Sequence, residues 1–267
     1  MKYINCKQYA QEILDEVKAI PNKKKLVIIS VGEDEASHRY VRGKIKDAEY
    51  CDIPYEHIQI ADDNMAALNL LATITENNLD KEVGGIILQL PLPESLDNIP
   101  FWESIAPEKD VDGLTKDSYF KPCTPKGIVH LLEKELGDLT GKNALVIGRS
   151  ILVGMPLAEM LLDKDCTVMV AHSKTDRNWL RRRLHDSDIV VSAVGKPEFL
   201  DLEDCWDAEI VVDVGINRDA NGKLCGDCYE FDEYENPTLK VTPVPGGVGL
   251  LTRAMLMKNV AEASQMD

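Results

Sequence analysis

Tyr40 and Lys44 form the first candidate for chemistry in this 267-residue sequence. They stand four residues apart in a segment with helical periodicity, so both side chains are expected on one face of a helix. A lysine whose pKa can be adjusted by its surroundings is suited to moving protons. A surface tyrosine that packs on a lysine stem gives the same spacing, so this pair by itself leaves both interpretations open.

Gln89 and an acidic loop with Asp110 and Asp112 extend this candidate site. Gln89 ends the apolar run GGIILQL, and the carboxyl ends of parallel strands are where ligands bind. A buried amide without a partner is costly, which makes a glutamine at the end of a strand suggestive of function. The presence of two aspartates indicates that this loop has a functional role. A capping or calcium-like turn is the alternative, although the calcium-ligand spacing does not continue.

The segment GRSILVGMP at residues 148–156 is the second candidate, a phosphate-binding loop. Its glycines follow an apolar run, where they let backbone amides approach a pyrophosphate, and the next helix adds the positive end of its dipole. Pro156 suits the first helical turn, because its missing amide costs nothing there. The spacing is GxSxxxG rather than GxGxxG, so an ordinary tight turn is the alternative. The predicted cofactor contacts here are Gly148, Arg149, Ser150, Val153, Gly154 and Pro156.

The segment HSKT at residues 172–175 favours NADP over NAD as the cofactor. NAD-binding domains usually place an Asp or Glu about 20 residues after the glycine loop, where it binds the ribose hydroxyls. Here no carboxylate occurs before Asp176. A hydroxyl, a lysine and Arg149 would instead form a pocket for a 2′-phosphate, whereas an exposed polar loop is the alternative. The predicted contacts in this segment are His172, Ser173, Lys174 and Thr175.

Alternating strand and helix patterns predict the elements that position these residues, in two successive α/β series. The first series contains strands at 25–32, 57–61 and 84–91 and helices at 34–51 and 65–76. The second contains helices at 125–136, 153–162 and 176–184 and strands at 143–148, 166–171, 188–194 and 209–215, and a last amphipathic helix covers 249–266. Residues 93–125, rich in proline and aspartate, are interpreted as the connection between two domains with parallel sheets.

The overall charge and the cysteines exclude several other classes of protein. With 46 acidic and 30 basic residues the net charge is −16, so the basic surplus that nucleic-acid binding needs is missing. No apolar run approaches the roughly 20 residues of a membrane helix, and the N-terminal segment has no apolar signal-peptide core, so a cytoplasmic protein is expected. Seven scattered cysteines predict reduced thiols. The single CxxC pair, Cys225 and Cys228, lacks a second pair or a nearby histidine, so no metal is expected.

Several motifs occur in one order along the chain and together are far more specific than any one alone. They are VGEDEASHRYVRGKIK, GGIILQLPLP, KDVDGL, PCTPKGI, GRSILVGMP, HSKT, DIVVSAVGKPEF, VVDVGIN and TPVPGGVG. With these motifs the chain strongly resembles the methylenetetrahydrofolate dehydrogenase/cyclohydrolase family, from about Val31 to the C-terminal helix. It departs from the family pattern in two places: the connection at 115–121 is short, and Leu250-Leu251-Thr252 stands where Pro-Met-Thr is common.

The resemblance implies a two-domain α/β enzyme that is bifunctional and homodimeric. It implies oxidation of 5,10-methylenetetrahydrofolate with NADP to the methenyl cation, and hydrolysis of that cation to 10-formyltetrahydrofolate. The expected folate-binding and catalytic domain covers residues 1–121 and is completed by a returning C-terminal helix at 246–267. The expected Rossmann-type NADP-binding domain covers residues 122–245. No nucleic-acid or membrane partner is expected.

The resemblance also implies roles for residues at matching motif positions. Lys44 would be the catalytic lysine, Tyr40 and Gln89 would organise it and the folate, and Asp112 would bind the pterin. One carboxylate can accept both the ring N–H and the exocyclic amine of a pterin. The implied substrate contacts are Tyr40, Lys44, Gln89, Leu90, Pro91, Asp112, Pro245, Gly246 and Gly247. Gly195 and Ile216 complete the implied cofactor contacts.

Two other classes of protein fit parts of this pattern. Another two-domain NADP dehydrogenase, acting on a small hydroxy or keto acid, would need a proton-transfer residue but not the pairing of Lys44 with Asp112. A nucleotide-sensing protein that kept only the Rossmann half would be favoured by loss of Lys44, Gln89 or Asp112, and all three are present.

Overall fold

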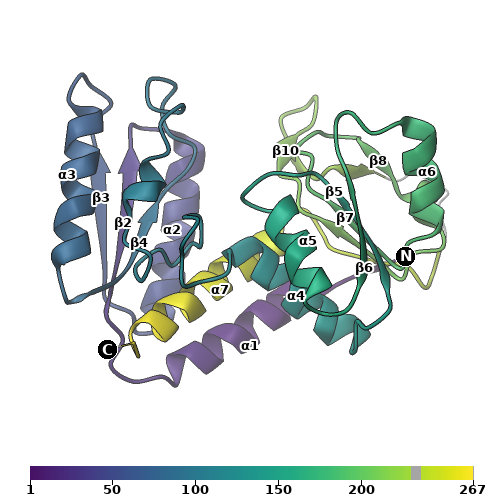
Figure 1. The fold of residues 1–267 in the computed structure, drawn as a ribbon, viewed down its shortest axis with the longest axis horizontal. Coiled ribbons are helices and arrows are strands. Elements are labelled where there is room, and N and C mark those ends of the chain that lie inside the picture. The colour runs from purple at the N-terminus through teal and green to yellow at the C-terminus, as the bar shows by residue number, and fades with distance from the viewer. Residues whose placement is uncertain (230–235, 267) are drawn as a thin grey trace. The chain divides into compact units, whose positions relative to one another are not determined.

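The chain folds into two compact units in the computed structural model, which describes residues 1–229 and 236–266 (Figure 1). The three-stranded unit comprises Gln11–Cys123 and the chain from Arg253 onward, and the six-stranded unit comprises Met1–Ala10 and Thr124–Thr252. Each unit is a parallel sheet with connecting helices, so the predicted α/β class with two domains is confirmed.

The three-stranded unit is built on β2 (Lys25–Val31), β3 (Tyr55–Ile60) and β4 (Val83–Leu88), in the order β3-β2-β4. The helices α2 (Glu35–Tyr50) and α3 (Ala66–Leu79) connect successive strands, which allows all three to run parallel. Strands β2 and β4 are almost wholly buried because they carry near-continuous apolar runs. Each strand and helix predicted for the first series is found, with ends that differ by a few residues.

Residues 93–123 belong to the three-stranded unit, so their interpretation as a connection between domains is wrong. Leu96, Phe101 and Ile105 lie in one buried cluster with apolar residues of α3 and β4, and a short 3-10 helix at Phe101–Ser104 packs against α3. The segment is rich in proline and aspartate, and its buried apolar residues follow no regular period, so the sequence pattern does not reveal them.

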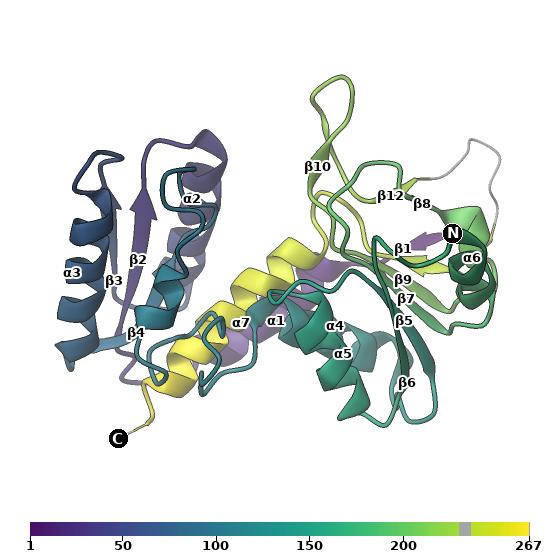
Figure 2. The same cartoon turned by 45° about the horizontal axis from the view of Figure 1, so that its top comes forward.

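The six-stranded unit has the strand order β1-β13-β9-β7-β5-β6, and every neighbouring pair is parallel. The chain leaves β5 for β6 through α5, and returns through α6 to β7 on the other side of β5. Accordingly, α4 and α5 lie on one face of the sheet and α6 on the other (Figure 2). The strands are β1 (Lys2–Tyr3), β5 (Asn143–Ile147), β6 (Thr167–Ala171), β7 (Ile189–Ser192), β9 (Ile210–Asp213) and β13 (Lys240–Val241). The helices are α4 (Cys123–Leu136), α5 (Gly154–Leu162) and α6 (Arg177–His185).

Several elements of the structure are not predicted by the sequence patterns. Helix α1 (Cys6–Lys18), which precedes the first series, is one of them. The predicted last helix, by contrast, is found as α7 (Val248–Ala263), one residue earlier at its start and three at its end. Two small sheets accompany the six-stranded one: β8 (Leu200–Asp201) pairs with β12 (Cys228–Tyr229), and β10 (Asn217–Arg218) with β11 (Leu224–Cys225). Two-residue strands are set by tertiary pairing and leave no local period. Among the described residues, no helix is both long and apolar enough to cross a membrane.

Candidate functional site

One face of α2 carries the first group of candidate residues. Asp34 caps the helix by accepting a hydrogen bond from the Ser37 amide at 2.6 Å, which fixes where the helix begins. From that start, the side chains of Tyr40, Lys44 and Asp47 fall at helical spacings of three and four residues, so they share a face. The predicted pairing of Tyr40 with Lys44 on one helix face is therefore found.

The Lys44 amine reaches the residue that ends β4. Its Nζ donates a hydrogen bond to Gln89 Oε1 at 3.0 Å. The Gln89 amide nitrogen donates to the Leu90 carbonyl, so both ends of a side chain that is only 7% exposed have partners. The Leu90–Pro91 peptide bond is cis. The structure thus brings together Lys44 and Gln89, which are 45 residues apart in the sequence.

Burial and a neighbouring carboxylate act in opposite directions on Lys44. Burial lowers the pKa of the Lys44 amine, while the charge of Asp112 raises it and the charge of Arg253 on α7 lowers it. Burial is the largest effect, so the pKa stays below its ordinary value. The sequence leaves open which effect is larger, and the structure resolves it in favour of burial. Burial likewise raises the pKa of Tyr40, against the charge of Arg253.

The two aspartates of the acidic loop have different environments. Asp110 is 1% exposed and its carboxylate accepts hydrogen bonds from the amides of Gly113 at 3.1 Å and Thr115 at 2.7 Å. Burial raises its pKa, and the bonds from Thr115 oppose that rise. Asp110 is thus the capping residue of a turn, the alternative to a functional role. Asp112 is half-buried, and its charge acts on Lys44.

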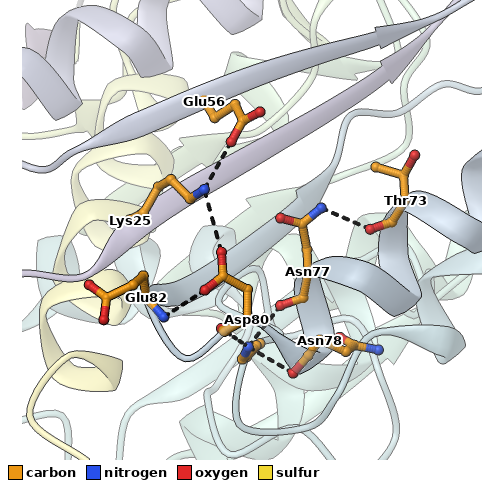
Figure 3. Close-up of polar contacts among 8 residues, drawn as sticks. Lys25, Glu56, Thr73, Asn77, Asn78, Asp80 and Glu82 are labelled. Atoms are coloured by element: carbon orange, nitrogen blue, oxygen red, sulfur yellow. Dashed lines mark hydrogen bonds and ion pairs between the residues drawn. The ribbon is translucent and has the colours of Figure 1, made fainter.

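Lys109, a residue not singled out in the sequence, anchors this loop to the end of α3. Its Nζ donates to the backbone carbonyls of Asn77, Asn78 and Asp80 at 2.8, 2.8 and 2.6 Å. Figure 3 shows these three residues at the helix end, where Asp80 also pairs with Lys25 of β2 at 3.6 Å. A cation that binds the last carbonyls of a helix also interacts favourably with the helix dipole.

Val111, between the two aspartates, is fixed by β4 and α7. A Cβ on Gly85 of β4 would lie 2.7 Å from either Cγ atom of Val111, so only glycine allows the loop to approach this strand. Asn259 of α7 donates its side-chain amide to the Val111 carbonyl at 2.9 Å. Val111, directly before Asp112, is therefore held by β4 and by α7, which fixes the backbone that carries the Asp112 carboxylate.

The glycine loop after β5 packs closely on neighbouring backbone at two positions that only glycine can occupy. Gly148 has a φ of +127°, and a Cβ there would lie 2.4 Å from the Ala193 carbonyl oxygen. A Cβ on Gly154 would lie 2.2 Å from the Gly148 carbonyl oxygen. The Ser150 hydroxyl accepts from the Val153 and Gly154 amides at 3.2 and 3.4 Å, at the first turn of α5. These residues fit a cofactor pyrophosphate, which binds at the amides of such a helix start.

The segment after β6 forms a tight turn. The His172 amide donates to the Thr175 hydroxyl at 2.9 Å, and the Thr175 amide donates to the His172 carbonyl at 2.8 Å. Asp176, the first carboxylate after the strand, accepts from the Trp179 amide at 2.9 Å and so caps α6. Ser173 and Lys174 are exposed, as is Arg149 of the glycine loop. The carboxylate that could bind ribose hydroxyls is thus used as a helix cap.

Asp227 organises the remaining predicted cofactor residues, and sequence reasoning missed it. It is fully buried and accepts hydrogen bonds from the amides of Val194, Gly195 and Lys196 at 2.7, 3.2 and 2.9 Å. It also accepts from the Ser192 hydroxyl and the Asn217 side chain at 3.0 and 2.9 Å. The loop that contains Gly195 and the residue after Ile216 therefore meet at one carboxylate. Asp227 lies between the two cysteines of the CxxC pair, a motif that points to a possible metal site and not to the aspartate inside it.

A second buried carboxylate, Asp213 at the end of β9, supports Asp227. It accepts from the backbone amides of Gly215, Asp227 and Cys228 at 2.9, 3.0 and 2.8 Å. Burial raises the pKa of Asp213, and these three bonds oppose that rise. Burial also raises the pKa of the Cys228 thiol well above its ordinary value. Within the described ranges, no group of three His, Cys, Asp or Glu side chains is arranged to hold a metal ion.

Pro245, Gly246 and Gly247 lie in the six-stranded unit, just before α7. Gly246 has a φ of +97°, and a Cβ on Gly247 would lie 2.2 Å from the Pro243 carbonyl oxygen, so both positions require glycine. The Val244–Pro245 peptide bond is cis. Helix α7 begins at Val248, so the unusual Leu250 and Leu251 lie inside its first turns, where Leu251 is buried against Gly127 of α4.

Two family models match the chain, and together they cover nearly all of it. A model described as the catalytic domain of tetrahydrofolate dehydrogenase/cyclohydrolase matches residues 4–112. A model described as the NAD(P)-binding domain of tetrahydrofolate dehydrogenase/cyclohydrolase matches residues 122–267.

Similar proteins include both curated relatives and solved structures. The Bifunctional protein FolD of Bacillus subtilis (strain 168) is 40% identical over 267 residues, covering 97% of this chain and 93% of the relative. The crystal structure of the bifunctional enzyme FolD from Campylobacter jejuni matches with a TM-score of 0.88 and 36% identity, covering 98% of this chain and 97% of that chain. The Trypanosoma brucei dehydrogenase-cyclohydrolase, complexed with NADP cofactor and inhibitor, matches with a TM-score of 0.87 and 30% identity, covering 98% and 97%.

Proposed function

The chain belongs to the tetrahydrofolate dehydrogenase/cyclohydrolase family, and we infer from this membership and from its site that it catalyses two consecutive reactions of one-carbon folate metabolism. The first reaction oxidises 5,10-methylenetetrahydrofolate to 5,10-methenyltetrahydrofolate, with NADP as the hydride acceptor. The second hydrolyses the methenyl cation to 10-formyltetrahydrofolate. The observation that supports this function most is the hydrogen bond between Lys44 and Gln89 at the end of β4, where the charge of Asp112 also acts on the Lys44 amine.

Lys44 is the residue that handles protons in the second reaction. Water that adds to the methenyl carbon must lose a proton, and the ring nitrogen that leaves must gain one. Burial favours the neutral form of the Lys44 amine, which can accept the proton from water. The hydrogen bond to Gln89 Oε1 holds the amine in one place during both transfers. Tyr40, four residues earlier on the same face of α2, borders the position of the folate.

Asp112 binds the pterin. One carboxylate accepts the ring N–H and the exocyclic amine of a pterin side by side, a pairing that is stronger than two neutral hydrogen bonds. The anchors at Lys109 and Val111, which both precede Asp112 in the chain, hold the loop in place before the substrate arrives. Leu90 and Pro91 border the same strand end, and Pro245, Gly246 and Gly247 complete the proposed substrate contacts.

The cofactor site lies at the ends of β5 and β6. The amides of Gly148, Arg149 and Ser150 and the start of α5, with Val153, Gly154 and Pro156, bind the pyrophosphate. Arg149, Ser173 and Lys174 bind the 2′-phosphate that distinguishes NADP, in the turn that His172 and Thr175 close. Gly195 and Ile216 border the remainder of the cofactor, in loops that Asp227 holds.

The domain boundaries, the assembly and the location of the protein complete the proposal. The proposed folate-binding and catalytic domain covers residues 1–121 and 246–267, and the proposed NADP-binding domain covers residues 122–245. These bounds differ from the compact units, in which residues 1–10 and 246–252 belong with the six-stranded sheet. The enzyme forms a homodimer in the cytoplasm, where its free cysteines stay reduced. Light scattering of the purified protein tests the dimer, and a monomer at micromolar concentration would contradict it.

A direct absorbance assay tests the function. The purified protein is mixed with 5,10-methylenetetrahydrofolate and either NADP or NAD, and the formation of NADPH or NADH and of the methenyl species is followed. Methenyltetrahydrofolate supplied alone then tests the hydrolysis, with the uncatalysed rate subtracted. NADP reduction and accelerated hydrolysis are expected. A protein that binds NADP but performs neither reaction would contradict the proposal.

A further inference from the structure

A guanidinium group occupies the space above Gly43 on the catalytic face of α2. A Cβ built on Gly43 would lie 2.0 Å from Nη1 and 3.0 Å from Cζ of Arg253. Gly43 directly precedes Lys44, and Arg253 comes from α7, which belongs to the same unit from this residue onward. The missing side chain in the middle of a helix therefore gives the Arg253 side chain its place beside Lys44.

An ion pair holds the guanidinium there. Arg253 Nε lies 2.9 Å from Asp47 Oδ2, and the two side chains are 26% and 14% exposed. Burial raises the pKa of the Asp47 carboxyl, and the neighbouring Arg253 opposes that rise. Asp47 follows Gly43 by four residues, so the glycine and the carboxylate lie one helical turn apart on the same face. This partner on α2 keeps the guanidinium over the glycine.

The groups around Lys44 come from every element that packs near it. They are Tyr40 and Asp47 on α2, Gln89 after β4, Asp112 in the following loop, Cys123 at the start of α4 and Arg253 on α7. The charge of Asp112 favours the protonated amine, as does the Cys123 thiol when it is ionised, whereas burial and the charge of Arg253 disfavour it. A guanidinium keeps its charge at every pH that the folded protein experiences. The charge of Arg253 therefore opposes that of Asp112, in the same direction as burial, which is the largest effect.

We propose that Arg253 is a positioning residue for the cyclohydrolase reaction: seated over Gly43 and held by Asp47, its guanidinium adds to the effect of burial and favours the neutral Lys44 amine beside the Asp112 carboxylate. The inference rests on the proposed role of Lys44 in moving protons. It explains how one site contains both a carboxylate for the pterin and a lysine that can accept a proton. Asp112 alone would favour the protonated, non-basic form of the lysine.

The test measures the titration of Lys44 directly. The rate at which an amine-reactive reagent labels Lys44 is followed against pH by mass spectrometry, because only the neutral amine reacts. In Arg253→Met the midpoint of labelling should move to higher pH, and in Arg253→Lys it should return towards the parent value. Lys258→Met removes another cation of α7, which pairs with Glu16, and should leave the midpoint unchanged.

Gly43→Ala provides a second test that leaves Arg253 in the sequence. The added Cβ displaces the flexible end of the arginine side chain, while alanine in a helix interior is more favourable than glycine, so the fold is kept. The Lys44 midpoint should again move to higher pH. In the double variant Gly43→Ala/Arg253→Met the movement should be no larger than in Arg253→Met alone.

The pH profile of the cyclohydrolase links the charge to catalysis. Its rising limb, measured with methenyltetrahydrofolate and corrected for uncatalysed hydrolysis, should move in the same direction as the labelling midpoint. An unchanged midpoint in folded Arg253→Met would overturn the role of Arg253 without affecting Lys44. A midpoint that moves while the cyclohydrolase profile stays fixed would instead overturn the proton-transfer role of Lys44, and with it the proposed purpose of Arg253.

Discussion

Replacing Lys44 with methionine should separate the two reactions of this enzyme. Methionine keeps the apolar stem of the side chain but removes the amine that donates to Gln89 Oε1 at 3.0 Å. Hydride transfer requires the alignment of two rings and no obligatory protein acid or base. Hydrolysis of the methenyl cation requires proton transfer, to which a positioned side chain typically contributes about 10²–10⁴-fold. The cyclohydrolase should therefore lose at least that factor in kcat.

The dehydrogenase should lose less activity. The upper limit of its loss is set by the cost of leaving the Gln89 oxygen without a hydrogen-bond donor. This buried oxygen loses a hydrogen-bond donor, which costs about 1–3 kcal/mol when the group stays unpaired. If that whole cost appeared as poorer placement of the folate, the dehydrogenase would fall by about 5–150-fold. Removing a buried amine also relieves its desolvation, so the observed loss should lie near the lower end of this range.

The two reactions are assayed separately on the same preparation. NADPH formation from methylenetetrahydrofolate measures the dehydrogenase, and the decay of added methenyltetrahydrofolate measures the cyclohydrolase. Lys46→Met, which removes an exposed lysine two residues further along α2, is the matched control and should change neither rate by more than about twofold. Equal losses in both reactions of Lys44→Met, or an intact cyclohydrolase, would refute the reasoning.

Four further results are expected. Arg149→Ala should lower kcat/KM for NADP by about 10–100-fold, the value of a charged hydrogen bond of about 1.5–3 kcal/mol, and lower that for NAD less; equal losses would contradict a 2′-phosphate contact. Asp112→Ala should weaken folate binding and slow both reactions together, whereas normal folate binding with only one reaction slowed would exclude its role in holding the pterin. Asp227→Ala leaves several buried donors unpaired, so calorimetry should show weaker NADP binding and a lower Tm, and an unchanged NADP affinity would contradict its support of the cofactor loops. Because the pKa of Lys44 is lowered in the folded protein, Lys44 binds fewer protons there than in the unfolded chain, where a lysine titrates at ~10.4. Urea unfolding should therefore show that the free energy of unfolding of the parent, relative to that of Lys44→Met, rises with pH towards this value. A difference that falls with pH would contradict the lowered pKa.

The elements that the sequence predicts well are those with a strong local period. Strand β2 carries a β-branched apolar run that ends in glycine, and α2 has a capping aspartate followed by a helical pattern, so both are found within a residue or two of the prediction. Tyr40 and Lys44 meet on one helix face for the same reason. Gln89 is predicted from burial alone, because a glutamine that ends an apolar run needs partners, and it has them.

Helix α1 carries a pattern that sequence inspection did not use. Its buried residues Cys6, Ala10, Ile13 and Val17 recur at spacings of three and four, which is the signature of an amphipathic helix. Charged and polar residues between them lower the mean hydropathy, so in the sequence the segment stands out only as one that lacks a signal-peptide core. The two-residue strands β1 and β13 are different, because their pairing depends on where the rest of the sheet has already formed.

The roles of the aspartates could not be predicted, because residue type and spacing are the same for anchors and for ligand-facing groups. Asp110 and Asp112 are separated by one residue, yet the first caps a turn from a buried position, and the second is half-buried and acts through its charge on Lys44. Asp227, fully buried, accepts five hydrogen bonds and has no oxygen left for a ligand. The fold alone determines which carboxylate accepts its hydrogen bonds from the protein's own amides. A carboxylate that serves as an anchor is buried and satisfied, whereas one that binds a ligand must keep acceptors open to solvent until the ligand replaces the water. That difference supports the proposal that Asp112, rather than Asp110, binds the pterin.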